Sequence, residues 1–243
     1  MWLLGYPEAS RSDAEHAIKN ARETGHATTL MHALFATHVY VYSGNYAAAN
    51  ASLDELIALA DERDAPYWKA LGTAVCGWLF AATGKASDAV RTITSGITSL
   101  RSTGASLYEP MHLQYLATAY LELGELDDAR RCIDDAIETM ERSKEKWCEA
   151  EVNRVAGEIA LQSLAPNPDK AEAYFDRALT LARQQQAKSW DLRAAMSMAR
   201  LWRDQGKRDE ARDLLAPVYG WFTEGFDTLD LKEAKALLDE LAT

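Results

Sequence analysis

The stretch from Met111 to Ile137, M-H-L-Q-Y-L-A-T-A-Y-L-E-L-G-E-L-D-D-A-R-R-C-I-D-D-A-I, has the pattern of two antiparallel helices joined at Gly124. Apolar residues recur at helical spacing before Gly124, which places one apolar stripe on one helix face. A second stripe with the same period follows the glycine. A residue that ends a helix often needs the left-handed conformation, which glycine adopts without steric cost. The stretch therefore predicts a helical hairpin with its turn at Gly124.

Small residues mark the contact between the two helices. Ala129 and Ala136 lie seven residues apart, about two helical turns, on one side of the second helix. Their small side chains allow two helix backbones to approach closely. Gly124, Ala129 and Ala136 resemble the glycine and the two small residues that the tetratricopeptide consensus has at the same spacing. The resemblance implies one unit of a helical repeat.

The hairpin recurs along the chain with a period of about 40 residues. Successive turn glycines are 39, 40, 40 and 82 residues apart, at Gly5, Gly44, Gly84, Gly124 and Gly206. Within the double interval, residues 164–169 with Pro166 and Pro168 replace the glycine turn. An alanine lies at the equivalent position after each turn from residue 44 onward, at Ala49, Ala89, Ala129, Ala171 and Ala211. The register predicts an all-α protein, a right-handed α-solenoid of tetratricopeptide-like hairpins with about 12 helices, formed by residues 1–243 as a single superhelical domain with hinges near 5, 44, 84, 124, 166 and 206.

Both ends of the sequence carry an expectation. Met1 to Gly5 has the pattern of the tail of a first helix whose beginning is absent, so we expect a fragment of a longer multidomain chain. At the other end, Thr228 is expected to cap a last helix over residues 228–242. Such a helix would close the solenoid by covering its last apolar surface.

Composition excludes several classes of partner. With 243 residues and 48% hydrophobic content, the chain can bury a large core. Its 26 basic and 37 acidic side chains give a net charge of −11, which argues against nucleic acid and against an anionic membrane. Three cysteines without a C-x-x-C pair are typical of reduced residues in a cytoplasmic protein. No apolar run approaches the length of a membrane span.

Motifs for catalysis or metal binding are not apparent in the sequence. Gly84-Lys85-Ala86 is a fragment of a phosphate-binding loop, but Leu79 replaces its first glycine and Ala86 its Ser or Thr. The five histidines never occur at zinc-ligand spacing. We expect no catalytic residue, no cofactor and no metal in this chain.

The tetratricopeptide resemblance implies that the first helix of each hairpin lines a concave groove. The groove positions are aromatic or histidine in the early units, at His38, Tyr42 and Trp78, and arginine in the later units, at Arg154, Arg193, Arg200 and Arg203. We expect the aromatic end to contact a protein or peptide and the arginine end to receive a carboxylate or phosphate. The alternative is that the rings only pack and that the arginines pair internally with Glu151, Glu158 and Asp204.

The last quarter of the chain resembles a larger family. Residues from Ala187, A-K-S-W-D-L-R-A-A-M-S, and from Leu214, L-L-A-P-V-Y-G-W-F-T-E-G-F-D-T, are similar to the C-terminal tail of bacterial class III adenylate/guanylate cyclase-like proteins. Those proteins place a cyclase domain first, then a predicted AAA-type ATPase, then a tetratricopeptide array. The cyclase metal-binding aspartates and the ATPase phosphate loop have no counterpart in this sequence. The resemblance therefore implies a regulatory segment for signal transduction, with its own ATPase domain as one candidate partner.

Three functional hypotheses follow. The first is a non-catalytic interaction module of a cyclase–ATPase-type signalling protein, which binds a protein or peptide. The second is a solenoid that senses a small, anionic effector and regulates an attached ATPase or cyclase. The third, an enzyme, has no support from any motif in the sequence.

Overall fold

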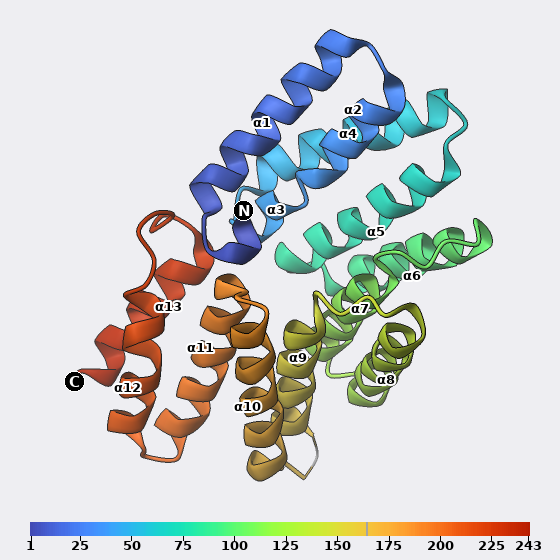
Figure 1. Ribbon diagram of the computed structural model, residues 1–243. Coiled ribbons are helices and arrows are strands. Elements are labelled where there is room, and N and C mark those ends of the chain that lie inside the picture. The colour runs from blue at the N-terminus through green and yellow to red at the C-terminus, as the bar shows by residue number, and fades with distance from the viewer. Residues whose placement is uncertain (164) are drawn as a thin grey trace. The chain divides into compact units, whose positions relative to one another are not determined.

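The computed structural model describes residues 1–163 and 165–243, which form helical hairpins in two compact units. Residues 9–145 form the N-terminal unit, and residues 146–243 together with residues 1–8 form the C-terminal unit. The described residues contain thirteen α-helices and one 3-10 helix and no strand (Figure 1). The all-α prediction is confirmed. That both units belong to one superhelical array stays a prediction.

Seven helices lie wholly in the N-terminal unit, and α1 lies there except for its first two residues. Their bounds are α1 (Pro7–Thr24), α2 (Ala27–Ala36), α3 (Val39–Tyr42), α4 (Tyr46–Glu62), α5 (Pro66–Ala82), α6 (Ala86–Ser102), α7 (Glu109–Leu123) and α8 (Leu126–Ser143). The hairpins α5–α6 and α7–α8 are the most extensively packed pairs of this unit. The second of them is the stretch with its turn at Gly124.

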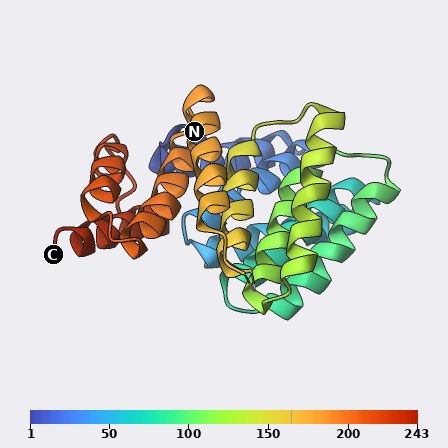
Figure 2. The ribbon, with the colours of Figure 1, turned by 90° about the horizontal axis from the view of Figure 1, so that it is seen from below.

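The C-terminal unit contains five α-helices and the short helix at the start of the chain. Their bounds are η1 (Trp2–Leu4), α9 (Glu149–Gln162), α10 (Pro168–Gln184), α11 (Lys188–Asp204), α12 (Arg208–Tyr219) and α13 (Leu229–Leu241). Helices α9 and α10 lie side by side in both views (Figures 1 and 2). Helix α13 agrees with the last helix expected over residues 228–242.

The repeat register is visible in backbone angles and in burial. Gly44, Gly84, Gly124 and Gly206 all have left-handed φ angles, of 76°, 76°, 75° and 81°. The alanines that follow the turns have no exposed surface, at Ala49, Ala89, Ala129, Ala171 and Ala211. Small residues are also required on the first helices, because a Cβ at Gly157 would collide with the Phe175 ring. The sequence therefore predicted correctly where the paired helices touch.

One first helix is interrupted, which changes the helix count. Residues 27–42 form two helices, α2 and α3, separated by Thr37 and His38. The Thr37 hydroxyl donates to the Leu34 carbonyl, and His38 Nδ1 donates to the Phe35 carbonyl at 3.0 Å. These side chains compete with backbone N–H groups for helix carbonyls, which weakens the regular ladder. Counting α2 and α3 as one broken helix restores the twelve helices expected.

The proline turn joins α9 to α10. Pro168 is the first residue of α10, where the missing N–H costs no helix hydrogen bond. The Asn167 side chain caps the helix by accepting from the Lys170 N–H at 2.9 Å. Leu164, the first residue of the predicted turn segment, lies outside the described residues.

The cap expected from Thr228 is wrong in its detail. Thr228 stands at the N-cap position of α13, but its side chain makes no bond to the N–H groups of the helix. Its hydroxyl donates to the Gly225 carbonyl at 2.7 Å instead. To cap the helix, the hydroxyl oxygen would have to accept from a helix N–H, and spacing in the sequence does not show whether the hydroxyl is oriented toward the helix or toward the preceding turn.

Residues 1–8 pack inside the C-terminal unit. The Ser189 hydroxyl donates to the Trp2 carbonyl at 2.6 Å, and the Trp2 and Trp190 rings meet edge to face at 4.9 Å. Glu8 is held at two atoms: its N–H donates to Glu224 and its carboxylate accepts from the Gly225 N–H, each at 2.9 Å. The sequence predicted a helix tail here, and it did not predict this packing.

Candidate functional site

Three predicted groove residues come together in the N-terminal unit. Tyr42 lies at the end of α3 and Trp78 on α5, and their ring centroids are 4.1 Å apart. Tyr115 from α7 stacks on Trp78 at 4.2 Å with an angle of 6° between the ring planes. His38 lies one helical turn before Tyr42, with ring centroids 6.5 Å apart. We call His38, Tyr42, Trp78 and Tyr115 the aromatic cluster.

Two members of the aromatic cluster are buried and two are partly accessible to solvent. Tyr42 and Tyr115 are 4% and 1% exposed, and their hydroxyls share a hydrogen bond of 2.8 Å. Trp78 and His38 are half-buried. Burial lowers the pKa of His38, although its hydrogen bond to the Phe35 carbonyl acts in the opposite direction. The accessible ring of Trp78 is therefore held in one position by two buried tyrosines.

Further rings extend this packing toward the start of the first helices. Phe35 contacts Trp68 at a centroid distance of 6.2 Å and Tyr108 at 5.0 Å. Tyr108 has a left-handed backbone (φ 66°), and its N–H donates to both carboxylate oxygens of Glu145 at 3.1 and 3.0 Å. Trp68 and Tyr108, near the starts of α5 and α7, thus contribute to packing within the N-terminal unit.

A histidine that the sequence did not single out lies beside the aromatic cluster. His112 on α7 has no exposed surface, and its ring centroid is 6.1 Å from that of Tyr115. In the described part of the chain, neither ring nitrogen has a hydrogen-bond partner. Burial, assisted by the positive charge of protonated His38, lowers the pKa of His112 to about 3. His112 is therefore neutral at pH 7.

The four predicted arginines lie in the C-terminal unit, and all are ion-paired. Arg154 on α9 holds both carboxylate oxygens of Glu151, at 2.8 and 2.9 Å, and reaches Glu158 at 3.3 Å. Arg193 on α11 contacts the same Glu151 at 3.0 Å. The Glu151 side chain is 2% exposed. Burial alone would raise its pKa, but Arg154 and Arg193 lower it below its usual range.

Helix α13 supplies the remaining carboxylates. Three pairs join it to α11: Asp230 faces Arg193 at 3.6 Å, Glu233 bonds Arg200 at 2.9 Å, and Glu240 bonds Arg203 at 3.0 Å. Asp204 also pairs with Arg203 at 2.8 Å. Burial raises the pKa of Asp230 more than Arg193 lowers it. The arginine face, formed by Arg154, Arg193, Arg200 and Arg203, is therefore paired with six carboxylates of its own unit, and its role in binding a partner stays a prediction.

The described residues offer no obvious metal centre. Within residues 1–163 and 165–243, no three His, Cys, Asp or Glu side chains form a group that could hold a metal ion. Cys76, Cys132 and Cys148 are free thiols, and burial raises the pKa of Cys76 to about 12. None of the described helices is both long and apolar enough to cross a membrane.

Comparison with known families places these helices in a defined class. The family described as the MalT-like TPR region matches residues 4–219. The chain belongs to this family. The matched residues of the MalT-like TPR chain end with α12, so α13 lies beyond them.

Solved structures share the fold of this MalT-like TPR chain. The crystal structure of BtubC (BKLC) from P. vanneervenii matches with a TM-score of 0.61 and 15% identity, over 97% of this chain and 89% of that chain. A crystal structure of a Podosopora anserina putative kinesin light chain with nearly identical TPR-like repeats gives a TM-score of 0.52 and 15% identity, over 88% and 95%. At this identity the likeness shows the fold alone. No curated protein matches the sequence significantly.

Two features of the MalT-like TPR chain escaped the sequence interpretation. Tyr115 and His112 lie three residues apart on α7, so they share a helix face, and this spacing was the available signal. The carboxylates at 230, 233 and 240 are spaced by three and seven residues, and the arginines at 193, 200 and 203 by seven and three. Matching polar stripes on two helices could have indicated that the helices pair.

Proposed function

We propose that this MalT-like TPR chain is a non-catalytic interaction module that binds a protein or peptide at the aromatic cluster. The observation that carries the proposal is the half-buried Trp78, stacked on one buried tyrosine and contacting another. Tryptophan and tyrosine are enriched among residues that dominate binding energy. A ring already fixed in the free protein loses little entropy on binding, which favours affinity.

The experiment that tests the proposal is selection of a displayed random-peptide library on the purified chain. Peptides enriched on the wild type are measured again on Trp78→Ala and on Tyr174→Ala. Tyr174 is a half-buried aromatic residue on α10, outside the aromatic cluster, and serves as the matched control. We expect Trp78→Ala to weaken capture by about tenfold or more and Tyr174→Ala to leave it unchanged. Peptides that bind both variants like the wild type would contradict the proposal.

The wider context of the module is part of the same proposal. The resemblance of residues 187–235 to the tail of cyclase-like proteins supports a role in a cyclase–ATPase-type signalling protein, with the ATPase domain as partner. The three free cysteines fit the cytoplasmic location expected for such a protein. The reading frame upstream of the Met1 codon tests this directly, because the proposal requires an ATPase sequence in it. A stop codon shortly upstream would contradict it.

A small anionic effector is the second candidate, and the arginine face favours it. The side chains of Arg200 and Arg203 are 40% and 24% exposed, and Glu233 and Glu240 opposite them are 44% and 51% exposed. Such exposed pairs stabilise by only about 0–1 kcal/mol, so a phosphate can replace the carboxylates at low cost. Variants distinguish the two candidate functions, because binding of a peptide would depend on Trp78 and binding of an effector on Arg200 and Arg203.

A further inference from the structure

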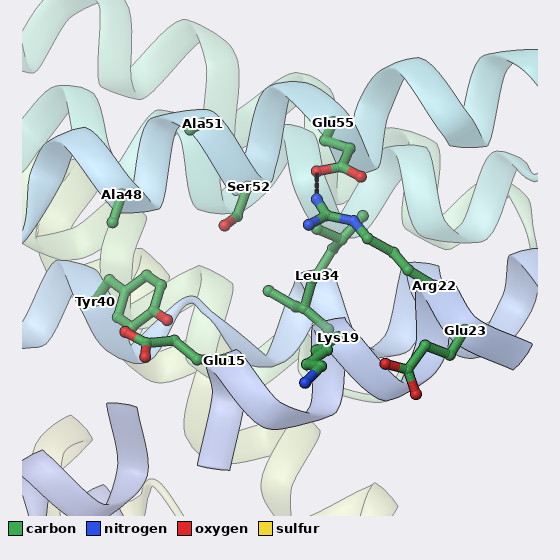
Figure 3. Close-up of a pocket in the computed structure, with 11 residues that line it drawn as sticks. Glu15, Lys19, Arg22, Glu23, Leu34, Tyr40, Ala48, Ala51, Ser52 and Glu55 are labelled. Atoms are coloured by element: carbon green, nitrogen blue, oxygen red, sulfur yellow. Dashed lines mark hydrogen bonds and ion pairs between the residues drawn. The ribbon is translucent and has the colours of Figure 1, made fainter. Parts of the chain in front are cut away.

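A cleft of about 610 Å³ lies between α1 and α4 in the N-terminal unit (Figure 3). Side chains from one face of each helix form its walls, and Leu34 with Tyr40 forms its floor. The volume is within the range of small-ligand sites in proteins. The cleft shares no residue with the aromatic cluster, although Tyr40 of the cleft and Tyr42 of the cluster lie on the same helix α3.

The two ends of the cleft differ chemically. At one end Arg22 of α1 and Glu55 of α4 form an ion pair of 2.6 Å that crosses the cleft. At the other end, the Tyr40 hydroxyl lies beside the Glu15 carboxylate (Figure 3). The Ser52 hydroxyl of α4 faces the space between them. Ile18, Leu34, Ala48 and Ala51 add apolar side chains to the lining.

Three polar side chains toward the Glu15 end can still accept hydrogen bonds. In the described part of the chain, Glu15 makes no ion pair, and the hydroxyls of Tyr40 and Ser52 make no hydrogen bond. Tyr40 as a whole residue is 5% exposed, and it lines the cleft. Burial, then the charge of Glu15, raises the pKa of Tyr40, while Arg11 lowers it.

The three groups select the charge and the shape of the ligand. A carboxylate and two hydroxyl oxygens are three acceptors, which matches the three donors of a primary ammonium group. Glu55 is paired with Arg22, whereas the Glu15 carboxylate makes no ion pair and can attract a positive ligand at its end, against the opposing charge of Arg11 near Tyr40. The apolar part of the wall suits a chain of methylene groups.

We propose that the cleft between α1 and α4 binds a primary ammonium group on an aliphatic stem, with the ammonium held by Glu15, Tyr40 and Ser52. The source of the ammonium is either a lysine side chain of another protein or a free alkylamine. Both present the same chemistry to the cleft.

Calorimetric titration of the full chain at pH 7 tests the proposal with defined probes. The probes are 1-aminopentane, 1-pentanol, and a tripeptide with a blocked amino terminus and a central lysine, in free and Nε-acetylated form. We expect the two amines to bind and the alcohol and the acetylated peptide to fail. A tripeptide that binds tighter than 1-aminopentane identifies a protein lysine as the ligand, and equal binding identifies a free amine. An alcohol that binds as well as the amine, or amines that produce no heat at millimolar concentration, would overturn the proposal.

Variants locate the site within the cleft. Glu15→Gln keeps the size of the side chain and removes its charge, and we expect it to weaken amine binding about tenfold. Tyr40→Phe keeps the ring and removes one acceptor, with a smaller expected loss. Glu23→Gln is the matched control, since Glu23 lines the same cleft on the same helix at the end with the Arg22–Glu55 pair. Equal weakening by Glu15→Gln and Glu23→Gln would show a diffuse charge effect and reject the site. Helical circular dichroism confirms that each variant is folded.

Discussion

The hydroxyls of Tyr42 and Tyr115 share a hydrogen bond of 2.8 Å although 73 residues separate them in the sequence. This bond joins the broken first helix of one hairpin to α7 across the Trp78 ring. We expect a double-mutant cycle of Tyr42→Phe and Tyr115→Phe to give a coupling free energy of about 0.5–1.5 kcal/mol in urea unfolding. A coupling energy near zero would mean that the two hydroxyls do not support each other.

His112 makes stability depend on pH. A histidine in an unfolded chain titrates near 6.5, whereas burial holds the pKa of folded His112 at about 3. Between these values the unfolded state binds the proton and the folded state does not. The contribution of neutral His112 to the free energy of unfolding is therefore fully present above pH 6.5 and is lost as the pH falls toward 3. At pH 5 we expect a loss of about 2 kcal/mol in the free energy of unfolding from this residue.

A variant isolates the contribution of His112 from that of other groups. We expect His112→Leu to flatten the urea midpoint between pH 7 and pH 5 relative to the wild type, and His16→Gln, at an exposed position, to leave the slope unchanged. Burial also lowers the pKa of His38, so part of the slope will remain in His112→Leu. An identical slope in His112→Leu and the wild type would refute the assignment.

The register makes a prediction about packing. Ala129 and Ala136 on α8 have no exposed surface, whereas Asp128 is half-buried and pairs with Arg131. Ala129→Leu or Ala136→Leu is expected to destabilise by roughly 1–3 kcal/mol, because the larger side chain forces the paired helices apart. Asp128→Leu should cost far less. Equal shifts of the urea midpoint in the two classes would show that the close helix contact is elsewhere.

The arginines are expected to differ in what they contribute. Arg154→Gln leaves the buried Glu151 carboxylate with Arg193 alone, so we expect a loss of about 3 kcal/mol. Arg200→Gln with Arg203→Gln breaks exposed pairs, and each should cost no more than about 1 kcal/mol. If these two arginines bind an anionic partner, the double variant loses the salt-dependent part of partner capture at nearly unchanged thermal stability. Unchanged capture together with lost stability would assign them a structural role.

Helix α13 is expected to keep the chain monomeric. Its buried residues Leu231, Ala234, Leu237 and Leu241 belong to the same core as Leu215 of α12. Deletion of residues 228–243 exposes this apolar surface and also removes three carboxylates from the arginine face. We expect the shortened chain to self-associate in light scattering. A shortened chain that stays monomeric and equally stable would remove the capping role.

The local part of this structure was predictable because it repeats. Gly124 and Ala129 occupy positions where the backbone angle or the close helix contact permits little else, and each recurs every 40 residues or so. The same logic assigned Tyr42 and Trp78 to predicted groove positions of neighbouring first helices, and their rings are in contact. Periodicity predicts such neighbours without knowledge of the rest of the chain.

The remainder depends on contacts that no local pattern encodes. The break at Thr37 arises from side-chain hydrogen bonds to helix carbonyls, and the same residue types also occur inside unbroken helices. The pairing of Arg200 with Glu233 requires knowing that α13 lies against α11. Burial of His112 without a polar partner runs against the usual preference of its residue type, so the pattern of residues offered no reason to expect it.

The hydrogen bond between the Gly225 N–H and the Glu8 carboxylate makes the C-terminal unit discontinuous in sequence, which has a consequence for biosynthesis. Residues 1–8 leave the ribosome before the N-terminal unit, whereas Ser189, Trp190 and Gly225 leave after it. The whole of the N-terminal unit is synthesised in the interval, so its hairpins have time to form on their own. Residues 1–8 therefore lack their packing partners until translation has passed Gly225. Only then can the C-terminal unit fold around Trp2.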